Sequence, residues 1–189
     1  MKNIPIIKTY KQKDIFPAMA DLEVEFKDRI TGKSIILDDN NNLALVGTTV
    51  NHIYTLPGGG IDSGESVEDG IIREAKEETG CDIEVVNILG IIDDYRNRDR
   101  KHCISYCAVA KLLKKGEHHM TEEEIKNGLH VKWVTISEAR GILLEENKKV
   151  KNGQINFYNT AYNIVRDYEF LLKLDNKQGQ ISSSVVVKS

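Results

Sequence analysis

Residues 58–81 read GGGIDSGESVEDGIIREAKEETGC, and this stretch says more about the fold and chemistry than any other part of the chain. Its pattern predicts a helix from about Val67 to Thr79. Ser66 with Asp69 forms a capping-box start, and Gly80 is suited to end the helix in a left-handed conformation. The three glycines ahead of the helix permit backbone geometries that other residues avoid.

Three glutamates, Glu74, Glu77 and Glu78, fall within an arc of roughly 100° near the end of this helix. Each like-charge pair at i,i+3 or i,i+4 costs about 0.2–0.5 kcal/mol, and a helix C-terminus disfavours anions. A hard divalent cation such as magnesium would offset this crowding and leave positions open for a phosphate substrate. The alternative is a solvated acidic face. An apolar stripe beside the arc puts the carboxylates at the edge of the buried face: Val67, Ile71 and Ala75.

The stretch resembles a complete Nudix box, a motif whose spacing is specific. Two positions that usually hold bulky aliphatic residues carry Ala75 and Cys81, which are small but apolar. The resemblance extends more weakly, through the strand pattern and the segment around Trp133, to roughly residues 25–148. The identities that match the box are, in order, Gly59, Glu65, Arg73, Glu74, Glu77, Glu78 and Gly80.

The resemblance implies a metal site for Mg²⁺, with Mn²⁺ as an alternative. Its ligands would be the carboxylates of Glu74, Glu77 and Glu78, with the carbonyl of Gly58 as a further one. In many members of the family a carboxylate from a later loop completes the site, and Glu124 is the candidate here.

The resemblance also implies an activity, since Nudix proteins typically hydrolyse a nucleoside diphosphate linked to another group. A metal lowers the pKa of a bound water, and one carboxylate takes its proton as the water attacks phosphorus. The catalytic set would be Glu77, Glu74, Arg73 and Glu65, with Glu65 and Arg73 as an ion pair that fixes the loop against the helix. Glu77 or a carboxylate of a later loop would be the general base. The alternative function is a nucleotide-sensing module that binds without cleaving.

A cationic segment, Tyr95–His102, is the candidate substrate-binding element and is expected to be a hairpin loop over residues 93–101. Tyr95, Arg96, Arg98 and Arg100 could bind a phosphate or stack on a base. The alternative is a solvated hairpin tip.

Substrate markers of the family do not fit this chain. The proline typical of ADP-ribose hydrolases would fall near Arg96, whereas the prolines are Pro5, Pro17 and Pro57. The tyrosine of dinucleoside polyphosphate hydrolases falls slightly beyond Tyr95, and the coenzyme A signature is missing. A nucleoside triphosphate remains open, and the sequence does not name the substrate.

The order of predicted elements gives an α+β fold, an α/β/α sandwich with a mixed β-sheet that carries the box helix and flanking helices. We expect an N-terminal arm (1–24), one domain (25–174) and a mobile tail (175–189). Predicted strands cover residues 33–37, 43–46, 50–56, 83–92, 103–113 and 130–134, and a short helix covers 137–146, capped by Thr135 and Glu138.

A late amphipathic helix should either pack across the domain or form a homodimer interface. Its stripe comprises Phe157, Ala161, Ile164, Val165, Tyr168, Leu171 and Leu172. Elsewhere, Gly32-Lys33-Ser34 superficially resembles a phosphate-binding loop, but Lys27 stands where that motif needs glycine. Lys33 is therefore predicted to be a cation at a strand edge.

The composition of the chain limits the cellular compartment and the binding partners that we expect. The 189 residues carry a net charge of −3, which indicates no general attraction to nucleic acid or anionic membranes. The start lacks the features of a signal peptide, and three cysteines do not suggest a disulfide framework, so a reducing cytoplasm is expected. Cys103 and Cys107 are predicted to be buried core thiols rather than zinc ligands with His118 and His119.

Overall fold

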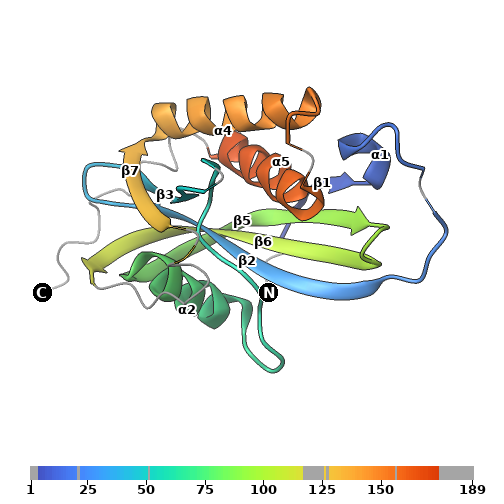
Figure 1. Cartoon of the computed structure of the whole chain (residues 1–189). Helices are drawn as coiled ribbons and strands as arrows, with labels where there is room; N and C mark the ends of the chain where they lie inside the picture. Colours follow the sequence, from blue (N-terminus) through green and yellow to red (C-terminus); the bar gives the residue numbers. More distant parts are fainter. Residues whose placement is uncertain are drawn as a thin grey trace, which may run out of the picture.

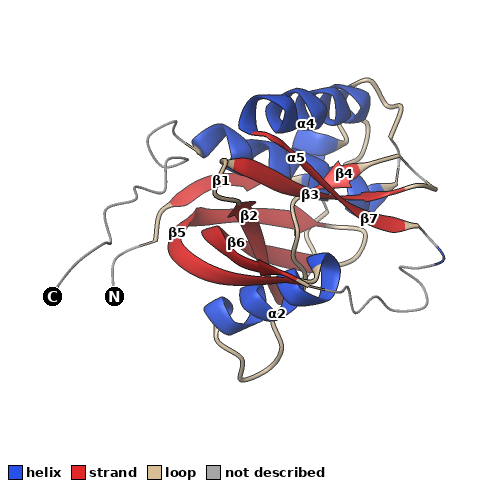
Figure 2. Cartoon of the chain, turned by 90° about the vertical axis from the view of Figure 1, so that its left-hand side faces the viewer, coloured by secondary structure: helices blue, strands red, loops and turns tan. Residues whose placement is uncertain are grey.

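A seven-stranded mixed sheet forms the centre of the protein in a computed structural model, which describes residues 4–20, 22–50, 52–116, 126, 128–155 and 157–174. Helix α2 covers one face of the sheet, and α4 and α5 cover the other (Figures 1 and 2). The strands are β1 (Ile6–Tyr10), β2 (Lys27–Leu37), β3 (Asn42–Thr48), β4 (Tyr54–Thr55), β5 (Cys81–Arg96), β6 (Lys101–Lys115) and β7 (Leu129–Thr135). The helices are α1 (Gln12–Ile15), α2 (Val67–Thr79), α4 (Ile136–Lys151) and α5 (Tyr158–Lys173).

The strand order is β1-β5-β6-β2-β3-β4, with β7 paired to β3. The long hairpin β5–β6 is antiparallel, while β2 runs parallel to β6 in unbroken register from the pair Lys27–Lys101 to Leu37–Lys111. At the edge, β1 pairs in parallel with β5. The polar first half of β2 is therefore held by backbone pairing rather than by an apolar pattern.

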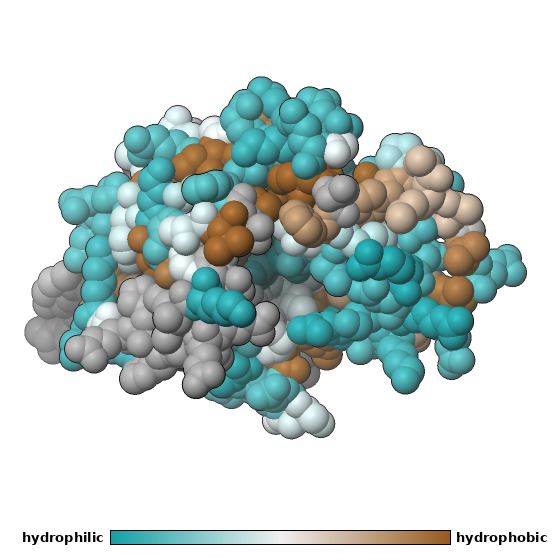
Figure 3. Space-filling model, viewed as in Figure 1, coloured by the Kyte–Doolittle hydropathy of each residue, from teal (hydrophilic) through white to brown (hydrophobic). Residues whose placement is uncertain are grey.

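Two hydrophobic clusters lie on opposite faces of the sheet. The cluster under α2 contains Ile36, Ile71 and Ala75, and the larger cluster under α4 and α5 contains Ile35 and Phe170. Successive residues of β2 thus serve opposite cores, as a pleated strand requires. The outer face of α4 is hydrophilic (Figure 3). The predicted α/β/α sandwich with a mixed sheet is confirmed.

Helix α2 confirms the prediction from the box. The hydroxyl of Ser66 accepts the backbone N–H of Asp69 at 3.1 Å, and Gly80 ends the helix at φ 68°. Helix α4 begins with the predicted cap, in which Thr135 accepts the N–H of Glu138 at 3.2 Å, but the helix runs five residues beyond the expected 146.

Two predictions for loops and strands are wrong. The expected loop 93–101 is mostly strand, because β5 and β6 stay paired out to Arg96–Lys101 and leave only a tight turn. The expected strand 50–56 shrinks to Tyr54–Thr55, because the chain turns back at His52, whose φ is 51°.

The predicted amphipathic stripe of α5 packs within the chain over part of its length. Ala161, Ile164, Val165 and Leu171 are buried, whereas Phe157 and Leu172 are exposed. Cys103 and Cys107 are free and buried, as predicted, and Cys81 is free and buried as well, while His118 and His119 lie outside the described residues. No helix of the described ranges is long and apolar enough to cross a membrane.

Candidate active site

Arg73 organises the acidic side chains of α2. Its Nε donates to Glu65 Oε1 at 2.9 Å and its Nη2 donates to Glu65 Oε2 at 3.0 Å, a two-pronged pair. Its Nη1 donates to Glu74 at 3.0 Å and to Glu77 at 3.2 Å, and its Nη2 also reaches the Gly60 carbonyl at 2.8 Å. One guanidinium therefore ties the glycine loop to two of the three predicted metal ligands.

Glu78 meets the same loop from the helix, since its carboxylate accepts the Gly58 backbone N–H at 2.7 Å. Gly59 lies against Glu74 so closely that a Cβ at this position would collide with the carboxylate. The box glycines are thus needed for close approach of backbone to carboxylates. We name Glu65, Arg73, Glu74, Glu77 and Glu78 the glutamate rim.

Lys33 is not the strand-edge cation expected from the sequence. Its side chain is buried beneath the glycine loop, where the ammonium donates to the carbonyl of Leu56 at 2.8 Å and to that of Gly58. The parallel pairing of β2 with β6 puts this residue in the middle of the sheet rather than at an edge.

Three members of the glutamate rim, Glu74, Glu77 and Glu78, fit a hard divalent cation in chemistry, because they offer carboxylate oxygens. Burial raises the pKa of Glu74 above its ordinary value, although Arg73 opposes the shift, so added positive charge would favour the ionised form. Across the described part of the chain, no three Asp, Glu, His or Cys side chains lie close enough together to hold a metal ion by themselves. Glu124, the further predicted ligand, lies outside the described residues.

A basic cavity of about 230 Å³ opens on the other side of the glycine loop, toward α5. Five of its eleven lining residues are arginine or lysine. We call it the basic pocket, and its lining consists of Arg29, Thr31, Lys33, Gly58, Gly59, Arg96, Lys101, Cys103, Asn159, Asn163 and Arg166.

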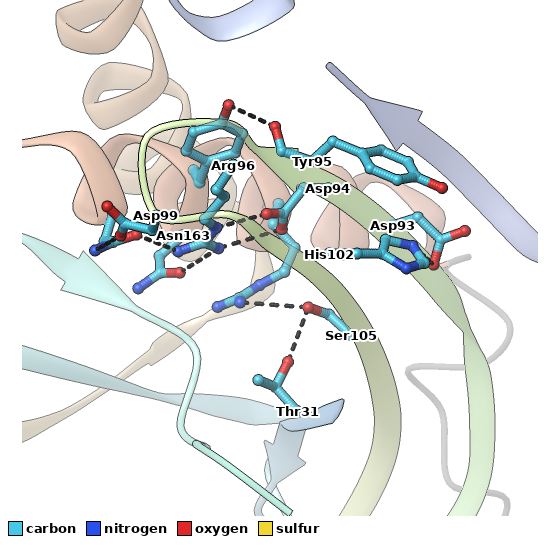
Figure 4. Close-up of polar contacts among 12 residues, drawn as sticks. Thr31, Asp93, Asp94, Tyr95, Arg96, Asp99, His102, Ser105 and Asn163 are labelled. Atoms are coloured by element: carbon cyan, nitrogen blue, oxygen red, sulfur yellow. Dashed lines mark hydrogen bonds and ion pairs between the residues drawn. The ribbon is translucent and has the colours of Figure 1, made fainter. Parts of the chain in front are cut away.

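Arg96 is held rigidly in this pocket (Figure 4). It pairs with the buried Asp94 through a 2.5 Å Nε–Oδ1 contact and donates to Asn159 at 3.0 Å and to Asn163 at 3.2 Å. Burial opposes the charge of Arg96, but the hydrogen bonds to Asp94 outweigh it and raise the pKa of the guanidinium. Its plane lies over the Tyr162 ring, 4.8 Å from the centroid.

Of the four predicted substrate-binding residues, only Arg96 lines the basic pocket. Tyr95 faces the opposite way along β5 and stacks on His102, with ring centroids 4.3 Å apart (Figure 4). Arg98 lies over the Tyr158 ring at 4.0 Å and pairs with Asp99, while Arg100 lies in the turn with φ 51°. Alternation along a strand separates neighbours that a loop could have brought together.

Helix α5 supplies pocket residues that sequence reasoning missed. Asn159, Asn163 and Arg166 follow the spacing i, i+4, i+7, so they share one face of the helix. This periodicity was visible in the sequence, but it lay beside a stronger apolar stripe.

Asp167 connects α5 to the glycine loop. This fully buried carboxylate accepts the Leu56 N–H at 3.0 Å and pairs with the Arg166 Nε at 2.9 Å. Leu56 immediately precedes Pro57 and the three glycines. The loop is therefore anchored from both faces of the sheet.

A Nudix fold with an intact acidic box is the class that this geometry defines, and comparison with known proteins agrees. The chain matches the model of the NUDIX domain over residues 31–158 and belongs to the Nudix family. The resemblance seen in the box is thereby confirmed.

The match to an individual relative covers less of the chain than the match to the family. An ADP-ribose pyrophosphatase of Methanocaldococcus jannaschii is 36% identical over 81 residues, which are 41% of this chain and 48% of that protein. The match thus spans about half the length of that relative.

Solved structures share the fold at low identity. A NUDIX hydrolase from Nitrosomonas europaea superposes with a TM-score of 0.53 at 17% identity, over 75% of this chain and 88% of the other. An ADP-ribose pyrophosphatase from Streptococcus suis gives 0.50 at 16% identity, over 77% and 90%.

Proposed function

We propose that this protein is a Mg²⁺-dependent pyrophosphohydrolase that cleaves the pyrophosphate bond of a nucleoside diphosphate linked to another group, with Mn²⁺ as an alternative metal. The observation that carries the proposal is the position of Glu74 and Glu78 against the glycine loop, directly beside a basic pocket, with Glu77 linked to Glu74 through Arg73. Hydrolysis of a diphosphate needs carboxylates that bind a metal ion, next to cationic side chains that bind the anionic substrate.

In this proposal, the side chains of Glu74, Glu77 and Glu78 would hold the metal, and the carbonyl of Gly58 would join them when it exchanges its hydrogen bond from Lys33 for the metal. The bound metal supplies charge neutralisation of the diphosphate and a more acidic water. Arg73 positions Glu74 and Glu77 by hydrogen bonds, with Glu65 fixing the opposite edge of its guanidinium.

Glu77 is our candidate for the general base. Its side chain is 48% exposed, against 14% for Glu74, so it is the more open of these two carboxylates to water. A base must reach the proton that it removes, and an open carboxylate at the rim meets that condition.

The test replaces single carboxylates. We expect Glu77→Gln and Glu78→Gln each to lower turnover by about 100-fold or more, with thermal unfolding close to that of the wild type. Glu68→Gln, an exposed glutamate in the first turn of the same helix, is the matched control and should retain activity. Wild-type rates in both box variants would refute the proposal.

ADP-ribose is the first substrate to assay, because one relative is named an ADP-ribose pyrophosphatase. A panel of nucleotide conjugates with Mg²⁺, in which the released nucleoside monophosphate is detected by chromatography, then separates the enzyme from a nucleotide-sensing module. Tight binding with no product would favour the sensor. The cytoplasmic location, the homodimer and the limits 1–24, 25–174 and 175–189 stay predictions.

A further inference from the structure

Lys33 links the two sides of the glycine loop. Its buried ammonium donates to the Leu56 carbonyl at 2.8 Å and to the Gly58 carbonyl. The N–H of Gly58, in turn, donates to Glu78 of the glutamate rim. The side chain of Lys33 also lines the basic pocket. One cation therefore binds the backbone beside the proposed metal ligands and borders the cavity proposed for the anionic substrate.

The strand beneath Lys33 explains its position. Arg29 and Lys33 lie on one face of β2 and both line the pocket, whereas a side chain at Gly32 would collide with Ile71 of α2 on the other face. The glycine loop lies alongside β2, where the Gly32 N–H donates to the Gly59 carbonyl at 3.0 Å. Lys33 thus reaches the loop from the pocket side, while the rim reaches it from α2.

Lys33 competes with a divalent ion for the Gly58 carbonyl. This oxygen is a metal ligand in the proposed function, and an ammonium bonded to the same oxygen lies close enough to repel a metal there. The charge of Lys33 already acts on the rim, since burial raises the pKa of Glu74 and Lys33, like Arg73, opposes this rise. Lys33 therefore has to leave the carbonyl when a metal binds to it.

The pocket offers the displaced ammonium no carboxylate. None of its eleven described lining residues is acidic. The two buried carboxylates beneath it are already used, because Asp94 pairs with Arg96 and Asp167 pairs with Arg166. A buried cation without a partner is costly, so Lys33 needs an anion from outside the chain. A diphosphate beside the glycine loop would supply that anion.

We propose that Lys33 is an exchangeable cation, which leaves the Gly58 carbonyl when a divalent ion binds there and then donates to a phosphate oxygen of the diphosphate in the basic pocket. This inference rests on the proposed function and makes Lys33 a substrate-binding residue. Metal binding and diphosphate binding become coupled, because each is easier once Lys33 has moved. Loss of the ammonium should therefore tighten metal binding and weaken diphosphate binding.

Lys33→Met tests the first half of the exchange, since methionine is unbranched and flexible but carries no charge. Binding of Mn²⁺ to the full chain is measured by electron paramagnetic resonance, which detects the free ion. We expect the variant to bind Mn²⁺ about tenfold more tightly than the wild type, because a hydrogen bond from a charged group no longer competes. A lysine that only supports the loop would have the opposite effect. Equal or weaker binding in the variant would overturn the inference.

Lys101→Met is the charge-matched control, because it removes another cation from the lining of the same pocket. It should bind Mn²⁺ like the wild type. Equal tightening in Lys33→Met and Lys101→Met would overturn the inference, by assigning the effect to the overall charge of the pocket.

Methylenediphosphonate, a diphosphate analogue that is not hydrolysed, tests the second half of the exchange. Its binding is measured by calorimetry with Mg²⁺ at a saturating concentration for each protein. We expect Lys33→Met to bind the analogue about tenfold more weakly than the wild type, because a hydrogen bond to a charged group is lost. Wild-type affinity in this variant would overturn the inference.

A measurement on the wild type avoids any effect of the substitution on folding. In protein that contains isotope-labelled lysine, NMR detects the hydrogen-bonded ammonium of Lys33 as a signal that Lys33→Met lacks. We expect Mg²⁺ to shift this signal in a saturable way and methylenediphosphonate to shift it again. A signal that stays unchanged while Mg²⁺ binds would overturn the inference.

These measurements separate the inference from the proposed function. A protein that shows the exchange of Lys33 but hydrolyses no diphosphate would refute only the proposed function. A hydrolase whose affinity for Mn²⁺ is not raised by Lys33→Met would refute only the inference. Absence of Mn²⁺ binding in both proteins would refute the two together.

Discussion

The glutamate rim and the basic pocket meet at the same glycine loop but are constructed differently. The rim comes from one helix and its leading loop, within residues 58–81, whereas the pocket collects side chains from β2, β5, β6 and α5. The rim is partly open to water, with Glu77 at 48% exposure, whereas the ion pairs of the pocket are buried. The acidic side chains of the rim are thus specified by local sequence, whereas the basic side chains of the pocket come together only when the chain folds.

This difference has an energetic consequence. Exposed ion pairs contribute about 0–1 kcal/mol, because water screens the charges and competes for them. Removing one partner of a buried pair leaves an uncompensated charge and costs about 3–5 kcal/mol. Substitutions in the rim should therefore affect activity more than stability, and substitutions beneath the pocket should affect stability first.

The largest expected effect is that of Asp167→Ala. It leaves the buried guanidinium of Arg166 and the Leu56 N–H without their partner, so we expect the free energy of unfolding to fall by about 3–5 kcal/mol. Urea denaturation measures this loss. Asp28→Ala, which removes an exposed carboxylate from β2, should cost less than about 1 kcal/mol. Equal losses in the two variants would contradict the energetic difference between exposed and buried ion pairs.

Gly58→Ala should have the next largest effect, because Gly58 lines the basic pocket and its N–H binds Glu78 of the rim. Its φ is 129°, and an added Cβ would collide with the Gly32 carbonyl oxygen. We expect a loss of about 3 kcal/mol in stability together with loss of activity. Gly64→Ala, at φ 85° in open space, tests strain alone and should cost about 1–2 kcal/mol. A well-folded, active Gly58→Ala variant would show that the loop leaves room for a side chain at this position.

The smallest effect is a pH dependence on the pocket side of the sheet. Burial raises the pKa of Cys107 above its ordinary value of 9.0, and the negative charge of Asp167 adds to the shift. The folded protein keeps this proton while the unfolded chain loses it. The stabilisation that comes from this bound proton is therefore complete below pH 9, and it is lost as the pH rises further. We expect unfolding to become easier by about 1 kcal/mol between pH 8 and pH 10.

Urea denaturation at both pH values measures this change, with Cys107→Ala as the comparison. That variant should show a smaller decline over the same range. An identical decline in the two proteins would place the titrating group elsewhere, for example at Tyr162, whose pKa is also raised by burial.

The structure also shows why some predictions from the sequence held and others did not. The helix Val67–Thr79, its Ser66 cap and the family assignment depend on contacts between residues close in the chain, and all three are confirmed. Lys33 and Tyr95 were misplaced because strand length and register depend on partners far away. The parallel pairing of β2 with β6 buries Lys33, and the extension of β5 turns Tyr95 away from the pocket.

From its residues alone, the chain determined an acidic helix capped at Ser66, ended at Gly80 and crowded with carboxylates, because helix geometry converts spacing directly into proximity. Only the tertiary structure decided which cations face those carboxylates across the glycine loop. Arg29, Arg96, Lys101 and Arg166 are separated by up to 137 positions and meet because strand pairing and the packing of α5 bring them to one cavity. No local pattern specifies such a meeting, since it depends on the register of the whole sheet.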